Sequence, residues 1–501
     1  MSGAELLVRL LQARGVEWAA TLCGHGLDPL FDACRRAGLR LVDTRNEQAA
    51  SYMADAAGRL TRRPGVVFSS SGVAHVNALT GATNAFFDGA PLLLVSGAAA
   101  VSTIGRGHFQ DLDQVTLAAP VCRYSRLIAD AASIAPMLEQ AWAAALGPPP
   151  GPVHLTFPMD VQRAEASPAL SINKSINRQI DKSPPLPLPD RPLLVAGSGV
   201  FYAGQGEALA RFCEECAVPV VVPIWDRGSI DRPIPQFMGV VGAASGGPRL
   251  LADADLVLLC GARPDYRVGY GDGRFVEIAP AHLGQIRLAP RPAWLAEAQR
   301  RRDEFRQSFE RAAARPPRGL HALDIVAALR VIVTDETILL IDGGSIGQWI
   351  HQLLCDRYPG RWLTCGASGV VGWGLPGAMA ARLCCPDRPV ILVSGDGAMT
   401  FTVAELECAA RQRLPFVAVV ADDRAWGITR AGHQRQFGQP IASDLGPVDF
   451  VKLAEALGAC GVRVTEPSAI AAAIRYGLHT GRPTVIHVPI PGGNDVPQIS
   501  T

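Results

Sequence analysis

The chain has 501 residues, and its 47 Lys and Arg against 46 Asp and Glu leave a formal charge of +1. This balance provides no basic stripe for a nucleic acid and no acidic tail for a basic partner. The length predicts about three domains.

Cysteine usage and the first residues bear on the cellular compartment. The twelve cysteines are scattered, and the CxxC of Cys213 and Cys216 has no second pair or histidine cluster at a zinc-binding spacing, so two thiols on a helix are expected. Scattered thiols are typical of a reducing cytoplasm. The start, MSGAELLVRLL, is unlike a signal peptide, and no apolar run reaches the length of a membrane span. We therefore expect a cytoplasmic protein without nucleic-acid or membrane partners.

The first part of the chain, residues 1–165, predicts an α/β domain. Helical patterns alternate there with short apolar runs that are typical of buried strands, at 65–69, 92–96 and 152–157. This alternation favours βαβ units and a parallel sheet. Residues 166–190 are polar and then proline-rich, which predicts a semi-rigid linker.

Two further α/β domains are expected, at 191–315 and 320–495. The central one has strand-like runs at 193–196, 218–222, 256–260 and 274–278, and a proline-rich segment at 313–319 separates it from the last. The predicted fold is thus α/β, with three domains that each hold a mainly parallel sheet flanked by helices. No repeat of fixed short period is visible.

The strongest chemical signal lies in the last domain. An apolar run at 390–393 is followed by Gly395-Asp396-Gly397, a helix-like stretch with apolar Val403, Leu406 and Ala410, and a second apolar run at 416–421 that ends in Asp422-Asp423. Parallel sheets bind ligands at the carboxyl ends of their strands. Carboxylate oxygens suit Mg²⁺, and a helix that begins after Gly397 offers N–H groups to a phosphate. The unit predicts a holder for Mg²⁺ and a diphosphate.

This pattern resembles the thiamine diphosphate (ThDP) motif, in which GDG and a spacer of this length precede Asn-Asn. The resemblance implies that Asp396, Asp423 and the carbonyl oxygen of Ala425 bind Mg²⁺. It also assigns to the cofactor Gly395, Gly397, Ala398 and Met399. The chain departs from the motif because it has Asp422-Asp423 in place of Asn-Asn. Asp423 then adds a negative charge beside an anionic cofactor.

A second match is RNEQAASYMADAAGRL at 45–60, which resembles the ThDP-family helix that carries the cofactor-activating glutamate. Here that residue is Glu47. A carboxyl group shielded from water at N1′ of the pyrimidine ring helps the cofactor lose its C2 proton and become an electron sink. Burial should raise the pKa of such a carboxyl. The alternative is an ordinary surface glutamate.

Two more matches follow in the first domain. The segment 69–97 resembles a family segment in which Gly72 and Asn77 keep their places, although the four residues between 72 and 77 differ. The loop FQDLDQ at 109–114 resembles an active-site loop, which would place Gln110 near the substrate. His25, in a Gly-His-Gly loop, and His75 would lie near the thiazolium ring and move protons, unless they are packed or solvent-facing histidines.

The last match, GVVGWGLPGAMAA at 369–381, resembles the family segment whose large apolar side chain supports the bent cofactor. Val371 holds that position and is a smaller wedge. Gly344 and Ser345 follow a strand expected at 337–341, where the family contacts the diphosphate; a simple tight turn explains them equally well. Trp426 is expected to pack beside the metal motif.

Together the matches resemble the acetolactate synthase and benzaldehyde lyase branch of the ThDP superfamily. They imply an enzyme that uses ThDP and Mg²⁺ to cleave or form a C–C bond beside a carbonyl of a small substrate, by 2-oxo acid decarboxylation or carboligation. Two alternatives remain: a ThDP-dependent cyclic 1,2-diketone hydrolase, and a catalytically silent paralogue with a binding role. FAD in the central domain is possible, but Gly197-Ser198-Gly199 is too generic to support it. The family also implies a homodimer, or a dimer of dimers, with the site at the subunit interface.

Overall fold

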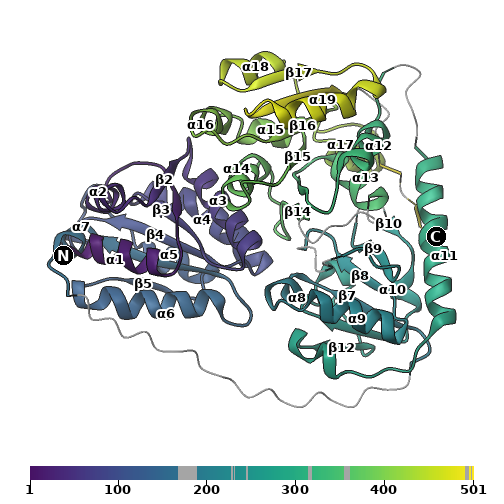
Figure 1. The fold of residues 1–501 in the computed structure, drawn as a ribbon, viewed down its shortest axis with the longest axis horizontal. Coiled ribbons are helices and arrows are strands. Elements are labelled where there is room, and N and C mark those ends of the chain that lie inside the picture. The colour runs from purple at the N-terminus through teal and green to yellow at the C-terminus, as the bar shows by residue number, and fades with distance from the viewer. Residues whose placement is uncertain are drawn as a thin grey trace. The chain divides into compact units, whose positions relative to one another are not determined.

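The chain forms two compact units, made of residues 1–180 with 379–384 and residues 181–378 with 385–501 (Figure 1). The computed structural model describes residues 1–167, 189–226, 230, 232–243, 246–313, 319–354, 362–490, 496–497 and 499–500. Most of the linker expected at 166–190, and most of the boundary expected at 313–319, lie outside the described residues. The predicted domain limits therefore stay predictions.

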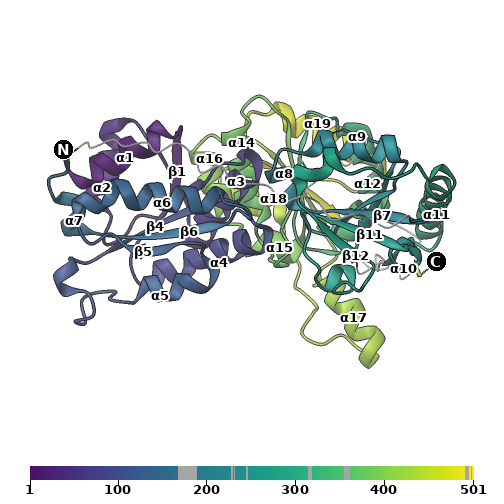
Figure 2. The ribbon, with the colours of Figure 1, turned by 90° about the horizontal axis from the view of Figure 1, so that it is seen from below.

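The first unit is built on a six-stranded parallel sheet with the order β2-β1-β3-β4-β6-β5. Buried apolar residues of α1, α2, α6 and α7 cover one face of this sheet, and α3, α4 and α5 lie on the other (Figure 2). The strands are β1 (Trp18–Thr21), β2 (Arg40–Asp43), β3 (Gly65–Ser69), β4 (Leu92–Ala98), β5 (Ser125–Leu127) and β6 (Pro152–Pro158). The helices are α1 (Gly3–Ala13), α2 (Asp28–Ala37), α3 (Glu47–Thr61), α4 (Val73–Asp88), α5 (Gln114–Ala118), α6 (Ile134–Leu146) and α7 (Met159–Arg163).

Small side chains let α3 and α4 approach closely, and a buried polar network fixes their register. A Cβ added at Gly81 of α4 would lie 2.4 Å from Oγ of Ser51 in α3. Closer to the C-termini of both helices, Arg59 pairs with Asp55 at 3.0 Å and with Asp88 at 3.6 Å, and all three side chains are buried. Breaking a buried pair costs about 3–5 kcal/mol. The network therefore fixes the C-terminal half of α3 against the C-terminal end of α4.

Two histidines lie in the core between α4 and the sheet. Nδ1 of His75 lies 2.7 Å from Oγ of Ser96, and the ring of His75 lies 4.7 Å from that of His154. Burial lowers the pKa of His75 to about 4 and holds the pKa of His154 well below its usual range. His75 is thus neutral in the folded protein at neutral pH.

This burial predicts a pH-dependent difference between wild type and His75→Asn. An unfolded histidine takes up a proton near pH 6.5, whereas His75 does so only near pH 4. Its contribution to stability is therefore complete above pH 6.5 and is lost as the pH falls to 4. The free energy of unfolding of His75→Asn, relative to wild type, should improve by on the order of 3 kcal/mol between pH 7 and 4. Urea denaturation measures this, Val95→Ala serves as a non-titrating core control, and a pH-independent difference would contradict it.

The second unit contains a five-stranded and a six-stranded parallel sheet, with the orders β12-β11-β7-β8-β9 and β14-β13-β15-β16-β18-β17. The central sheet consists of β7 (Pro192–Ala196), β8 (Val220–Pro223), β9 (Phe237–Val241), β11 (Leu256–Cys260) and β12 (Phe275–Ile278). The last sheet consists of β13 (Ile338–Ile341), β14 (Trp362–Thr364), β15 (Val390–Gly395), β16 (Val417–Asp422), β17 (Cys460–Arg463) and β18 (Thr484–Pro489). A short parallel pair joins β10 (Gly246–Gly247) to β19 (Ile499–Ser500).

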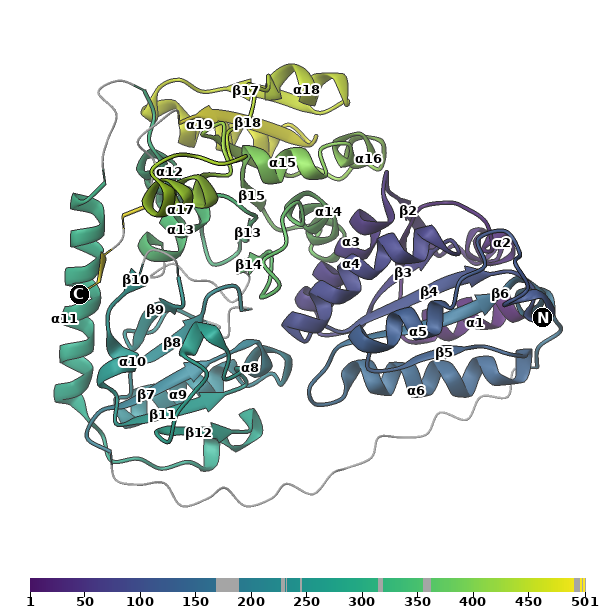
Figure 3. The ribbon, with the colours of Figure 1, turned by 180° about the vertical axis from the view of Figure 1, so that it is seen from behind.

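Helices flank both sheets of this unit, and α11 runs along its side (Figure 3). They are α8 (Ser198–Tyr202), α9 (Gly206–Cys216), α10 (Leu250–Asp253), α11 (Pro292–Arg311), α12 (Ala322–Ile332), α13 (Ser345–Leu353), α15 (Asp396–Phe401), α16 (Glu405–Arg411), α17 (Gly427–Phe437), α18 (Phe450–Ala456) and α19 (Pro467–His479). Helix α14 (Gly374–Cys384) begins in this unit, and its residues 379–384 belong to the first. The two sheets share one apolar core, in which the rings of Phe309 and Trp349 lie 4.8 Å apart. Hydroxyl Oγ1 of Thr364 also donates to the carbonyl of Trp225 at 2.8 Å.

The α/β fold with parallel sheets is confirmed, and one local prediction is wrong. The helix expected after the GDG motif is interrupted at residues 402–404, between α15 and α16. Buried Thr402 donates from Oγ1 to the carbonyl of Gly372 at 2.7 Å. This contact from another segment ends α15 after six residues. The helix also begins at Asp396 itself rather than after Gly397.

Candidate functional site

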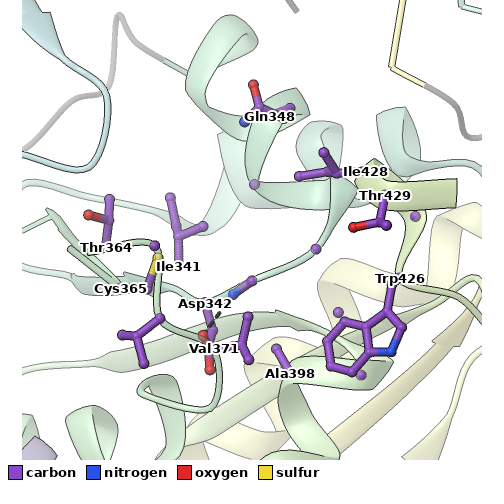
Figure 4. Close-up of a pocket in the computed structure, with 18 of the residues that line it drawn as sticks. Ile341, Asp342, Gln348, Thr364, Cys365, Val371, Ala398, Trp426, Ile428 and Thr429 are labelled. Carbon is purple, nitrogen blue, oxygen red and sulfur yellow. Dashed lines mark hydrogen bonds between the residues drawn. The ribbon is translucent and has the colours of Figure 1, made fainter. Parts of the chain in front are cut away.

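A cavity of about 230 Å³ opens at the carboxyl ends of β13, β15 and β16 in the second unit (Figure 4). This is the edge at which parallel sheets bind ligands. Seven of the residues assigned from sequence line it: Gly344, Val371, Gly395, Asp396, Gly397, Ala398 and Ala425. The structure therefore gathers motifs that lie more than fifty residues apart in the chain.

Two glycine turns touch in the floor of this cavity. The N–H of Gly395 donates to the carbonyl of Gly343 at 2.8 Å. Gly344 has φ +119°, a conformation that L side chains rarely adopt, and a Cβ there would lie 2.9 Å from Cα of Gly395. Both turns thus present bare backbone to the cavity. The glycines after β13 therefore form a tight turn and also line the cavity.

Val371 lies over these turns, and Asp342, which the sequence reasoning missed, holds its loop. A Cβ added at Gly343 would lie 2.7 Å from Cγ1 of Val371. The buried carboxylate of Asp342 accepts backbone N–H bonds from Gly372 at 3.2 Å and from Gly374 at 2.8 Å, both directly after Val371. Burial raises the pKa of Asp342 to about 6, although these N–H groups oppose the shift. The position of Asp342 directly after a strand of buried apolar residues could have identified it from the sequence.

Asp396 and Asp423 form a pair of neighbouring carboxyl groups at the cavity. Oδ1 of Asp396 is buried and has no hydrogen-bond partner among the described residues. Burial, with the charge of Asp423 next to it, raises the pKa of Asp396 to about 7, and burial raises the pKa of Asp423 to about 6. The raised pKa values mean that ionising these two carboxyl groups without a cation nearby is unfavourable. A divalent cation would remove that cost.

Asp422, the first of the two aspartates that stand in place of Asn-Asn, forms a hydrogen bond within the protein. Oδ2 of Asp422 lies 2.8 Å from Nε2 of His487, which is buried beside it on β18, and Oδ1 accepts the N–H of Arg424 at 3.2 Å. The carboxyl group of Asp422 is therefore engaged by the sheet. Of the two changes from the family pattern, the one at Asp423 adjoins Gly427, which lines the cavity.

The remaining residues of the metal motif surround this pair. The position of a Cβ at Gly427 lies 2.3 Å from Oγ of Ser345 and 2.4 Å from Oδ2 of Asp423, so these two side chains meet there. Trp426 lays its ring over Gly397, where a Cβ would lie 2.8 Å from Cζ3, which is the expected packing role. Met399 is buried in α15 and is not among the cavity-lining residues.

In the first unit, Glu47 and Asn77 are brought together. Glu47 is the first residue of α3, and Asn77 lies one turn into α4. Nδ2 of Asn77 donates to Oε2 of Glu47 at 3.0 Å. Glu47 is half-buried, so the shielding from water expected for it is incomplete within this unit.

Gly72 and Gln110 also lie together, next to Ser71 and Gln114. Gly72 has φ +61°, and a Cβ there would lie 2.8 Å from both Cβ and the carbonyl oxygen of Gln110. Oε1 of Gln110 accepts from Oγ of Ser71 at 3.0 Å, and the N–H of Gly72 donates to Oε1 of Gln114 at 2.9 Å. The predicted loop of 109–114 is thus bound to the start of α4. Ser71 and Gln114 were not predicted.

The two candidate histidines have different surroundings. His25 is half-buried and stacks on His108 at 5.8 Å between ring centres, with the exposed Phe109 at its edge. His75 is fully buried against Ser96 and His154. His75 is therefore placed as a histidine packed in the core.

The Gly197-Ser198-Gly199 turn of the central sheet does not fit a flavin diphosphate. The N–H of Ser198 already donates to Oδ2 of Asp226 at 2.9 Å, and Asp226 is paired with buried Arg267 at 2.5 Å. A Cβ added at Gly199 would lie 2.7 Å from Cα of Gly261, so the strand ends are closely packed. We expect the purified protein to show no flavin absorbance; a stoichiometric flavin released on denaturation would contradict this.

The residues of the second unit do fit a metal-bound diphosphate. Two hard carboxylates adjoin bare backbone that a substituted side chain would block, and one of them has a buried oxygen without a partner in the described ranges. Among the described residues no three His, Cys, Asp or Glu side chains gather for a metal, so a third protein ligand here would be a carbonyl oxygen such as that of Ala425.

In the described ranges, none of the helices combines the length and apolar character needed to cross a membrane.

Comparisons with known proteins agree with this geometry. Three family models match in order: the N-terminal TPP binding domain of thiamine pyrophosphate enzymes at residues 1–117, their central domain at 189–300, and their C-terminal TPP binding domain at 342–488. The chain is 28% identical to a probable acetolactate synthase of Mycobacterium bovis, over 97% of this chain and 95% of that protein. It is also 28% identical to 2-hydroxyacyl-CoA lyase 2 of Homo sapiens (92% and 84%) and to acetolactate synthase of Bacillus subtilis (97% and 93%). The chain therefore belongs to the thiamine diphosphate-dependent enzymes of the acetolactate synthase-like superfamily, which use ThDP with Mg²⁺.

Proposed function

We propose that this enzyme cleaves or forms the C–C bond beside a carbonyl group, as a ThDP- and Mg²⁺-dependent lyase or carboligase. The observation that carries the proposal is the carboxyl pair of Asp396 and Asp423 beside two bare glycine turns and Val371. The acetolactate synthases and the 2-hydroxyacyl-CoA lyases among the relatives support this class of chemistry.

In this proposal the second unit holds the diphosphate end of the cofactor. Asp396, Asp423 and the carbonyl of Ala425 bind Mg²⁺, and the backbone at Gly344 and Gly397 with the hydroxyl of Ser345 contacts the phosphates. Val371 supports the cofactor from below, and Asp342 fixes Val371 through its bonds to Gly372 and Gly374. Because the loop is held by a buried carboxylate, a small valine keeps a defined position.

Glu47 is proposed to hold a proton at N1′ of the pyrimidine ring. ThDP, when bound, supplies an electron sink for the carbon beside the carbonyl. Asn77 fixes Oε2 of Glu47, which leaves Oε1 to share the proton with the ring nitrogen. Gln110 lies beside Gly72 on the substrate side. His25 is the better placed of the two histidines to exchange protons, because its ring is half-buried rather than enclosed.

We further propose a homodimer, or a dimer of dimers, in which a second subunit covers the Glu47 region. Val73 and Val76, in the first turn of α4 next to Asn77, are 68% and 46% exposed. Large apolar side chains exposed beside a functional carboxyl group favour a protein partner there. That cover would shield Glu47 from water. The described cysteines are free thiols, which supports a cytoplasmic location.

A complementation experiment tests the shared site. Glu47→Gln and Asp396→Ala should each be inactive alone. Co-expressed, they form mixed dimers in which one of the two sites keeps both residues, so random pairing should restore about a quarter of wild-type activity. Steady-state turnover of the whole co-expressed population, purified without separating the dimer types, measures this. Activity no higher than that of the single variants would place Glu47 and Asp396 of each site in one chain.

A further inference from the structure

The Gly-His-Gly loop that carries His25 packs directly onto the ends of two strands of the first sheet. A Cβ added at Gly24 would lie 2.7 Å from Oγ of Ser70, just after β3. Gly26 has φ +96°, which L side chains rarely adopt, and a Cβ there would lie 2.9 Å from the backbone nitrogen of Ala98 at the end of β4. Both glycines that flank His25 are therefore needed for the loop to approach the sheet.

Gln162, a fully buried residue of α7, ties this loop to two other segments. Its Nε2 donates to the carbonyls of Gly26 at 2.6 Å and of Phe157 at 2.7 Å, and its Oε1 accepts the N–H of Leu30 at 3.3 Å. The partners assign the orientation of the amide, because a carbonyl can only accept and an N–H can only donate. Gln162 thus joins the loop to β6 and to the first turn of α2.

The helix that carries Gln162 is itself held at both ends. The N–H of Gly3 donates to the carbonyl of Ala164 at 2.9 Å, directly after α7. At the start of α7, the carboxylate of Asp160 accepts the N–H of Val101 at 3.1 Å. The amide of Gln162 therefore has a fixed backbone behind it.

The carbonyl of His25 is engaged as well, from the other side of the loop. Oγ of Ser70 donates to it at 2.7 Å, and the N–H of Ser71 donates to it at 3.3 Å. Two successive carbonyls, of His25 and Gly26, are thus bound by different elements. These bonds set the direction in which the side chain of His25 leaves the backbone.

The ring that is fixed in this way has an unused nitrogen. Nε2 of His25 is buried and has no hydrogen-bond partner among the described residues. The ring lies between His108, stacked at 5.8 Å, and Phe109, edge-on at 5.5 Å. Because buried polar atoms almost always have partners, Nε2 is the atom of His25 that a bound ligand would engage.

We infer that Gln162 is a positioning residue for the proposed reaction: with Ser70, it fixes the backbone of residues 25 and 26 and so the place of the His25 ring. This inference rests on the proposed function, in which His25 exchanges protons. Proton transfer needs heavy atoms within hydrogen-bond reach, and a misplacement of about 1 Å can cost on the order of 10²-fold in rate. Gln162 itself touches no reacting atom, because its amide is used by three backbone groups.

A double-mutant cycle tests whether Gln162 acts through His25. Turnover of the enzyme loaded with ThDP and Mg²⁺ is measured with pyruvate and with benzoin, a 2-oxo acid and an α-hydroxyketone. Gln162→Met, which has no donor, should lower kcat at least tenfold and change KM less than twofold. In the His25→Asn background the same change should lower kcat less than twofold, because no proton-exchanging ring is left to position. An equal loss in both backgrounds would overturn the inference.

A milder variant and a matched control complete the cycle. Ser70→Ala leaves the N–H of Ser71 on the carbonyl of His25, and it should lower kcat about threefold, again only while His25 is present. If Gln162→Met does not fold, this pair decides. Trp294→Phe removes another buried donor, from Nε1 to the carbonyl of Pro192 at 2.9 Å in the second unit. It should lower the melting temperature and leave kcat unchanged.

A readout without substrate separates failure of this inference from failure of the proposed function. In protein with carbon-13-labelled histidine, the ring Cε1–H signal of His25 is identified by its absence in His25→Asn. It should move in Gln162→Met and in Ser70→Ala and stay in place in Trp294→Phe; an unmoved signal in the first two would overturn the inference even where turnover falls. If the signal moves but neither substrate turns over, the placement of His25 by Gln162 is supported and the proposed function alone is contradicted. Equal turnover of wild type and His25→Asn would overturn both the role of His25 and the inference.

Discussion

Glu47→Gln is expected to lower turnover by roughly 10²- to 10⁴-fold, the range that a positioned acid–base group contributes. Glutamine can keep the hydrogen bond with Asn77, but it has no carboxyl proton to share with the pyrimidine ring. The change should leave the fold intact, because Glu47 is half-buried at the first position of α3, outside the Arg59 network. Steady-state turnover and thermal unfolding of the same sample measure the two effects.

A matched control separates this loss from a change at a helix end. Asp28→Asn removes the carboxylate from the first residue of α2, an exposed position in the same unit. Each change should cost only about 0.3–1 kcal/mol through the helix dipole. Asp28→Asn should keep wild-type turnover. Equal turnover in Glu47→Gln and Asp28→Asn would remove Glu47 from the chemistry.

Asp396→Ala is expected to weaken Mg²⁺-dependent ThDP binding by at least about 100-fold, since even residues that only orient a metal ligand cost 10- to 100-fold. The alanine removes the buried oxygen that has no partner in the described residues. It also leaves Asp423 as the remaining carboxylate of the neighbouring pair. Calorimetric titration with ThDP at fixed Mg²⁺ measures the change.

Asp423→Asn is the partner variant, and its effect should be opposite in kind. The amide keeps an oxygen for Mg²⁺ and removes one negative charge beside the diphosphate, so affinity should be kept or increased. The Asp422 and His487 pair, which the change leaves intact, keeps the end of β16 in place. Loss of binding in Asp423→Asn as large as in Asp396→Ala would show that a carboxylate, rather than any oxygen, is required at 423.

The sequence was sufficient for the most apolar strands, and the reason is physical. The runs that became β3, β11 and β15 are apolar and buried on both faces, so they read clearly as strands of a parallel sheet. The end of α15 could not be read this way. Val403 continues the helical spacing, and the helix stops because Thr402 bonds to Gly372, a contact between segments distant in the chain.

The orientation of single side chains was also beyond the sequence. His25 and His75 both lie in loops or helix starts that match the family, yet His25 is half-buried and His75 is enclosed between α4 and the sheet. Asp342 and His487 acquire their roles only when strands bring Gly372 and Asp422 to them.

The first and last sheets share the strand order 2-1-3-4-6-5 within each sheet. No short sequence period announces this likeness. Many different apolar residues can build the same layers, and the order of strands is set by the right-handed connections between them. In the proposed function, Glu47 of α3 beside the first sheet and Asp396 of α15 beside the last have different roles.

The most direct test of the central claim is a calorimetric titration of metal-stripped, dialysed protein with ThDP, with and without Mg²⁺. The Asp396 and Asp423 pair predicts tight, stoichiometric binding that requires Mg²⁺. Absence of binding under both conditions would contradict the assignment of this cavity to the cofactor.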